Sequence, residues 1–169
     1  MSIERPTSGG FTKALILLLT ALAILVADQV TKALVVANLA VGENAQLVGD
    51  LVQVWHAQNR GASFSLFQGW SIVFLAVSVL SIGMVAYFHR SLRNHSPWLH
   101  VLLGVILGGT LGNFIDRLRQ GYVTDWLSIG FGETRWPTFN VADSSLVVGI
   151  AILVIYLLRT NPERREATA

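Results

Sequence analysis

Four long apolar runs constrain the fold of this chain more than any other feature of its sequence. They cover roughly residues 13–36, 70–88, 98–115 and 141–158. A helix rises about 1.5 Å per residue and the hydrocarbon core of a bilayer is about 30 Å thick, so each run can span it. Only helices and closed barrels satisfy every backbone polar group in lipid, and the runs lack the period-two alternation of barrel strands. The sequence therefore predicts an α-helical integral membrane protein with four transmembrane helices.

The composition agrees with lipid as the solvent. Of the 169 residues, 53% are hydrophobic and 13% are charged, against about 25% charged residues in an average soluble domain. The formal net charge is only +2, and the basic residues lie near the ends of the apolar runs. That distribution suits membrane topology, so we expect no nucleic-acid partner. The chain has no cysteine, which excludes disulfides and thiolate chemistry.

We expect one membrane-embedded domain over residues 1–169, with extracytoplasmic segments at 37–69 and 116–140. In the first segment, two short apolar stretches flank Gly49 and Asp50, which predicts a β-hairpin. We therefore expect a small extracytoplasmic β-sheet between the first and second helices. In the second segment, residues 118–139 include Gly130, Gly132 and Pro137 and are too polar for lipid. A cleaved signal peptide is the alternative for the first run, but its apolar stretch continues through Ala27, where a processed chain turns polar.

The basic residues predict the orientation of the chain. Four spans place both termini on one side of the membrane. Seven of the 12 Lys and Arg residues fall on that side, namely Arg5, Lys13, Arg90, Arg93, Arg159, Arg164 and Arg165. The positive-inside rule then places the termini in the cytoplasm.

The third run carries small residues and then polar ones. Gly104, Gly108 and Gly112 recur every four residues, so another helix can approach this face closely. Asp116 lies one turn further along this stripe, and Gly109, Asn113 and Arg117 form a parallel stripe beside it. Interfacial anchoring is one explanation of the polar residues, and a polar site on the packed side is the other.

Asp28 and Lys32 are four residues apart in the first run. This spacing places them on one helix face, where they can form an ion pair. A structural pair that anchors the helix end is the simpler interpretation, and a catalytic role is the alternative.

Asp125 and Asp143 are the candidate catalytic groups. Asp143 falls in the first turn of the fourth helix, with Asn140 as its expected N-cap. The helix dipole there favours an anion. If Asp125 folds back beside it, the pair holds one proton between two carboxylates, which is the equipment for peptide hydrolysis. Taken from the residues alone, simple helix caps remain the alternative.

Other chemistries fit the sequence less well. Ser144 and Ser145 lack a G-x-S-x-G elbow. The histidines have no metal-binding spacing, and the spacing of the aspartates matches no metal loop. We therefore expect no metal.

Four blocks in order resemble the signal peptidase II (lipoprotein signal peptidase) family. Asp28-Gln-Val-Thr-Lys32 resembles its D-x-x-[ST]-K motif, and Asn59-Arg-Gly61-Ala-Ser-Phe-Ser65 its N-x-G-A-[AS]-F-S motif. Residues 108–125 are similar to the third block, and residues 139–143 to the fourth. Together, in this order and spacing, the blocks are highly specific.

The resemblance implies an aspartyl endopeptidase of the bacterial inner membrane, with its active site near the periplasmic face. Its substrate is a diacylglyceryl-prolipoprotein, cut before the lipidated cysteine. The implied roles are a catalytic dyad at Asp125 and Asp143; substrate binding or dyad orientation at Asn59, Asn113, Arg117 and Asn140; and support at Asp28, Lys32, Gly61, Gly109 and Asp116. It also implies contact with membrane lipids, inhibition by globomycin and no cofactor, and we expect a monomer.

Two other classes of protein remain as alternatives. A small four-helix transporter needs ionisable residues near the middle of its spans, and the centres of these runs carry none. An assembly factor would need only the glycine face, with the polar blocks incidental.

Overall fold

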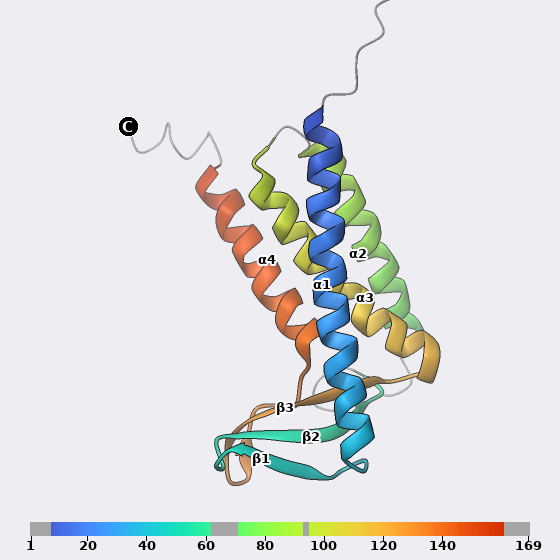
Figure 1. Cartoon of the computed structure of the whole chain (residues 1–169), viewed down its shortest axis with the longest axis vertical. Coiled ribbons are helices and arrows are strands. Elements are labelled where there is room, and N and C mark those ends of the chain that lie inside the picture. The colour runs from blue at the N-terminus through green and yellow to red at the C-terminus, as the bar shows by residue number, and fades with distance from the viewer. Residues whose placement is uncertain (1–7, 62–70, 93–94, 161–169) are drawn as a thin grey trace, which may run out of the picture.

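The computed structural model describes residues 8–61, 71–92 and 95–160. Its four long helices form a bundle, and a small sheet covers one end of it (Figure 1). The helices are α1 (Ser8–Asn38), α2 (Ser71–Ser91), α3 (Pro97–Gln120) and α4 (Val141–Thr160). All four are long and apolar enough to cross a membrane, which confirms the expected fold class. The start of α1 and the end of α4 both lie at the end of the bundle away from the sheet (Figure 1).

α3 is the central helix, because it packs against each of the other three. The apolar core lies around it and includes Leu17, Val85, Leu103 and Ile106. The outer faces of the surrounding helices are also apolar, with Leu80 64% exposed and Val147 70% exposed. A soluble protein rarely leaves so continuous an apolar surface uncovered, so this surface faces lipid.

The glycines of α3 allow close helix packing, as the sequence predicted. A Cβ atom on Gly104 would lie 2.6 Å from the carbonyl oxygen of Leu17, and one on Gly108 would lie 2.6 Å from that of Ala21. Gly112 faces α1 as well, where a Cβ would collide with the carboxylate of Asp28. The stripe therefore brings α1 into backbone contact with α3.

Local signals set the ends of α3. Ser96 caps its start by accepting a hydrogen bond from the backbone N–H of Trp98 at 3.4 Å, and Pro97 occupies the first turn. Gly121 ends the helix in the left-handed conformation, with φ of 77°. α3 therefore continues beyond the apolar run that predicted it, because a helix end depends on its cap and not on the last apolar residue.

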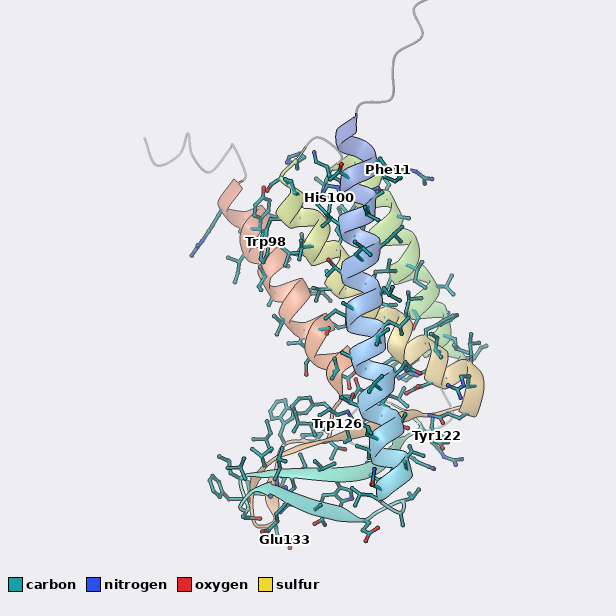
Figure 2. The ribbon with its side chains drawn as sticks, in the orientation of Figure 1. Phe11, Trp98, His100, Tyr122, Trp126 and Glu133 are labelled. Carbon is teal, nitrogen blue, oxygen red and sulfur yellow. The ribbon has the colours of Figure 1, made fainter. Side chains whose placement is uncertain are left out.

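Within the described residues, the sheet has four antiparallel strands in the order β1-β2-β3-β4. β1 (Asn44–Val48) and β2 (Val52–Asn59) form the expected hairpin, with Gly49 at a φ of 49° in its turn. β3 (Val123–Phe131) pairs with β2, and β4 (Thr134–Arg135) pairs with β3. Figure 2 shows Glu133 at the tip of the β3-β4 turn, far from the helices.

The sequence did not predict β3 and β4, which come from the segment between α3 and α4. The sheet thus joins both segments that connect the helices at this end of the bundle. The alternation Val123, Leu127, Ile129 and Phe131 was a strand signal, but Asp125 interrupts it. The pairing places Asp125 directly opposite Ala57 of β2.

Candidate active site

Asp143 is fixed in the first turn of α4 by a reciprocal cap. The backbone N–H of Asp143 donates to Asn140 Oδ1 at 2.9 Å, and the backbone N–H of Asn140 donates to Asp143 Oδ2 at 3.2 Å. This is the capping-box arrangement, which satisfies two N–H groups at the helix start. Asn113 of α3 donates to the other oxygen, Asp143 Oδ1, at 2.7 Å. Asp143 is therefore held by its own helix and by α3.

Asp125 lies on β3 where the sheet meets the helix bundle, and it is 2% exposed. Its Oδ2 accepts a hydrogen bond from Asn59 Nδ2 at 2.9 Å, and its Oδ1 accepts one from Asn140 Nδ2 at 2.7 Å. Asn59 is the last residue of β2, so the β2-β3 pairing supplies one of these donors. The sheet therefore has a direct part in the site.

Asn140 joins the two carboxylates. Its side-chain amide reaches Asp125, and its backbone N–H reaches Asp143. The same amide donates to Asn113 Oδ1 at 3.1 Å, and the residue is 1% exposed. The structure thus brings Asp125 and Asp143 into hydrogen bonds with one buried asparagine, an arrangement that the sequence could only suggest.

The environment of Asp125 favours its protonated form. Burial raises its pKa, and the nearby charge of Asp143 raises it further, to about 7. The hydrogen bonds from Asn59 and Asn140 oppose this shift, because they stabilise the ionised carboxylate. At neutral pH the carboxyl of Asp125 is therefore poised between its acid and base forms, as general acid–base catalysis requires.

A buried cluster of charged residues lies next to Asp125 and Asp143, and Asn113 contacts both the cluster and Asp143. Lys32 Nζ contacts Asp28 Oδ2 at 2.8 Å and Asp116 Oδ2 at 2.9 Å, and it donates to Asn113 Oδ1 at 3.0 Å. Lys32 is 4% exposed and Asp28 is fully buried. The Asp28–Lys32 ion pair is present, but it is no simple helix-end anchor, because Lys32 also holds Asp116 and Asn113.

The cluster also fixes the start of α4. Asp28 Oδ1 accepts a hydrogen bond from the backbone N–H of Ala142 at 3.0 Å. Gly109 leaves room for this approach, since a Cβ there would lie 2.6 Å from the carbonyl oxygen of Ala142. The residue before Asp143 is therefore positioned by α1 and α3 together.

Gln29 is a further member of this cluster, and no sequence motif predicted a role for it. Its Nε2 donates to Asp116 Oδ1 at 3.1 Å, to Asp28 Oδ2 at 3.2 Å and to the carbonyl oxygen of Gly112 at 3.3 Å. The available signal was a polar amide next to Asp28 inside an apolar run.

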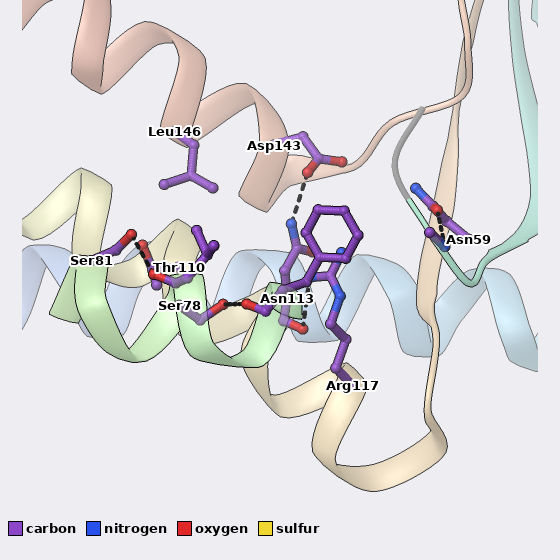
Figure 3. A pocket seen from close by; sticks show the side chains of 11 residues that line it. Asn59, Ser78, Ser81, Thr110, Asn113, Arg117, Asp143 and Leu146 are labelled. Carbon is purple, nitrogen blue, oxygen red and sulfur yellow. Dashed lines mark hydrogen bonds between the residues drawn. The ribbon is translucent and has the colours of Figure 1, made fainter. Parts of the chain in front are cut away.

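A pocket of about 290 Å³ opens beside Asp143 (Figure 3). Asn59, Gly61 and Arg117 line it near the sheet. The backbone N–H of Gly61 donates to Asn59 Oδ1 at 3.1 Å, and the Arg117 guanidinium lies 4.9 Å from the ring centre of Phe74. Residues 62–65, which complete the Asn59 motif, lie outside the described part of the chain.

The described residues contain no group of three or more His, Cys, Asp or Glu side chains that could hold a metal ion. Asp28 and Asp116 come close together, but the ammonium group of Lys32 lies between them. A lysine in that position neutralises charge as a bound cation would.

The chain matches the family described as signal peptidase (SPase) II over residues 20–159. It belongs to the signal peptidase II family. A lipoprotein signal peptidase of Dehalococcoides mccartyi is 40% identical over 158 residues, which cover 89% of this chain and 94% of that protein. One from Rhodococcus jostii is 42% identical over 154 residues, covering 86% and 74% of the two chains.

Solved structures agree with this family and its fold. Two structures described as a bacterial membrane enzyme, each 28% identical to this chain, have TM-scores of 0.77 and 0.74. The first covers 90% of this chain and 91% of its own, and the second covers 89% and 95%. This signal peptidase II family member is thus a multi-pass bacterial membrane protein. Its family does not favour the transporter or the assembly factor.

Proposed function

We propose that this protein is an aspartic endopeptidase that removes the signal peptide from diacylglyceryl-modified prolipoproteins by cleaving before the lipidated cysteine. One observation carries the proposal: Asn140 hydrogen-bonds two aspartates from different elements at the sheet end of a membrane bundle. The relatives named lipoprotein signal peptidase support the choice of substrate.

In this proposal, Asp125 and Asp143 share one proton. Asp143 at the start of α4 is the anion, because the helix dipole and the N–H of Asn140 stabilise negative charge there. Its carboxylate takes a proton from a water molecule, and the oxygen of that water attacks the scissile carbonyl carbon. Protonated Asp125 donates its proton to the carbonyl oxygen. The tetrahedral intermediate then collapses: Asp143 donates its proton to the leaving nitrogen and the C–N bond breaks. Asp125 takes a proton from one hydroxyl of the intermediate, which restores the starting state of both aspartates.

The neighbouring residues have positioning roles. Asn59, Asn113 and Asn140 orient the two carboxylates through the hydrogen bonds described above, and Arg117 borders the pocket where the substrate would lie. The positions that support them are Asp28, Lys32, Gly61, Gly109 and Asp116.

The same proposal includes location and partners. The protein resides in the bacterial inner membrane with its termini in the cytoplasm, so that the sheet and the aspartates are near the periplasmic face. The distribution of basic residues supports this orientation. The substrate arrives through the bilayer, whose lipids surround a monomeric enzyme. We further propose that a globomycin-type cyclic peptide inhibits it, and that no cofactor takes part.

Cleavage of a lipidated precursor by the purified Asp125→Asn and Asp143→Asn variants in detergent tests the dyad. Each variant should lower kcat by at least about 100-fold, because general acid–base catalysis contributes roughly that much or more. Asp50→Asn is the matched control, since Asp50 lies in the β1-β2 turn and is half-exposed. Near-full activity in either folded dyad variant would contradict the proposal.

A further inference from the structure

The pocket beside Asp143 extends from the polar cluster toward the middle of the membrane. Its deeper wall includes Ser81, Thr110 and Leu146 (Figure 3). Ser81 is about ten residues from the start of α2, which corresponds to roughly 15 Å along the helix axis. The pocket therefore connects Asp143 of the candidate dyad with the level of the hydrocarbon core.

Three hydroxyl groups line this otherwise largely apolar part of the pocket, and each already donates its proton to its own helix. Ser78 Oγ donates to the carbonyl oxygen of Phe74 at 2.8 Å. Ser81 and Thr110 do the same to the residues four positions earlier, at 2.9 and 2.8 Å. A hydroxyl has one donor and two acceptor lone pairs. Each of these hydroxyl oxygens can therefore still accept a hydrogen bond, but its proton is already donated.

A substrate in this pocket would need acceptors. A segment that spans the membrane as a helix satisfies its own N–H groups, but a segment unwound for cleavage does not. Each unpaired N–H at the level of the hydrocarbon core costs several kcal/mol. The helical backbone of the walls offers little help, since its carbonyl oxygens are engaged within the helices.

We propose that Ser78, Ser81 and Thr110 accept hydrogen bonds from main-chain N–H groups of the unwound part of the signal peptide. This inference rests on the proposed function and assigns how that site recognises its substrate. The hydroxyls act as positioning groups: they lower the cost of an extended backbone in the membrane and so favour chains that can unwind near the scissile bond.

Backbone esters test the proposal directly. Lipidated peptide substrates are made in which one amide on the signal-peptide side of the cleavage site is replaced by an ester, which removes the N–H and keeps the chain shape. For at least one position, kcat/KM of the wild type should fall by about five- to tenfold, the effect of one net hydrogen bond. The same substrates are then tested on Ser78→Ala, Ser81→Ala and Thr110→Val. The variant that lacks the hydroxyl accepting from that N–H should cleave the amide and the ester substrates equally well.

Two controls keep the result specific. Thr20→Val removes a hydroxyl that also donates four residues back, to Ile16 at 2.8 Å, but Thr20 is on α1 and does not line the pocket; its ester sensitivity should equal that of the wild type. Thr110→Ser keeps the hydroxyl and should restore the sensitivity lost in Thr110→Val. Thermal unfolding identifies any variant that fails to fold.

The inference and the proposed function can fail separately. If the wild type cleaves the amide substrate and esters are equally harmful in all hydroxyl variants, or harmless in the wild type, the hydroxyls do not accept these bonds. The peptidase assignment would still stand in that case. Failure of the wild type to cleave the amide substrate would overturn both.

Discussion

At the scale of single residues, Asp125 sets the expected pH dependence. Its pKa is raised to about 7 by burial and by the charge of Asp143, so its carboxyl keeps a proton below that pH and loses it above. A reaction that needs this proton should slow by about tenfold per pH unit as the pH rises beyond about 7. The measurement is kcat against pH in detergent.

The Asn59→Ala variant tests whether Asp125 causes this decrease of kcat at high pH, the alkaline limb of the pH profile. The amide of Asn59 donates to Asp125 Oδ2 at 2.9 Å and stabilises the ionised form. Its removal should raise the pKa of Asp125 and move the alkaline limb to higher pH. The control is Asn38→Ala, because Asn38 bonds only to the backbone of its own helix among the described contacts, at 2.7 Å. A limb that does not move would assign the titration to another group.

Lys32 should be the most sensitive residue for stability. It is 4% exposed and contacts both Asp28 and Asp116. Lys32→Met leaves two buried carboxylates without their counter-charge, and breaking a buried ion pair from one side costs about 3–5 kcal/mol. Thermal unfolding in detergent should show a large loss, while Arg119→Met, at an exposed position of α3, should change stability by less than about 0.5 kcal/mol. Equal unfolding temperatures for the two variants would contradict this account.

At the scale of elements, the packing of α1 on α3 depends on glycine. A Cβ on Gly108 would lie 2.6 Å from the backbone oxygen of Ala21 and 2.7 Å from Cβ of Ile24, so the helices would have to separate. Gly108→Ala should cost about 1–3 kcal/mol. The same change at Gly83 of α2 meets nothing within 4 Å and should be neutral or stabilising by up to about 1 kcal/mol. Comparing the thermal unfolding of these two variants separates the cost of disturbed helix packing from the effect of helix propensity.

The helices were predictable and β3 was not, for a physical reason. Apolar length alone identifies a membrane helix, since lipid leaves the backbone few alternatives. β3 alternates like a strand, but Asp125 stands where an apolar residue would continue the pattern. Its burial against Asn59 and Asn140 is a tertiary property. The residue that obscured the strand is the one that the site uses.

At the scale of the whole molecule, the family motifs identified the polar residues of the site, and the structure shows which of them contact one another. Asp28, Lys32 and Asp116 were expected only to support the site. In the structure, Asp28 bonds the N–H of Ala142 next to Asp143, while Lys32 reaches Asn113. Such links join α1, α3 and α4, and sequence spacing cannot show them because the partners are far apart in the chain.

Orientation in the membrane is the property of the whole molecule that can be tested most directly. The chain has no cysteine, so single cysteines report location without background. Glu133 is exposed in the β3-β4 turn, and His95 is exposed between α2 and α3 at the opposite end of the bundle. With the termini in the cytoplasm, a membrane-impermeant maleimide added to intact spheroplasts should label Glu133→Cys and leave His95→Cys unlabelled. Detergent lysis should make both reactive, which controls for burial. Labelling of His95→Cys alone in intact spheroplasts would place the aspartates on the cytoplasmic side, where an enzyme processing exported lipoproteins would not reach its substrate.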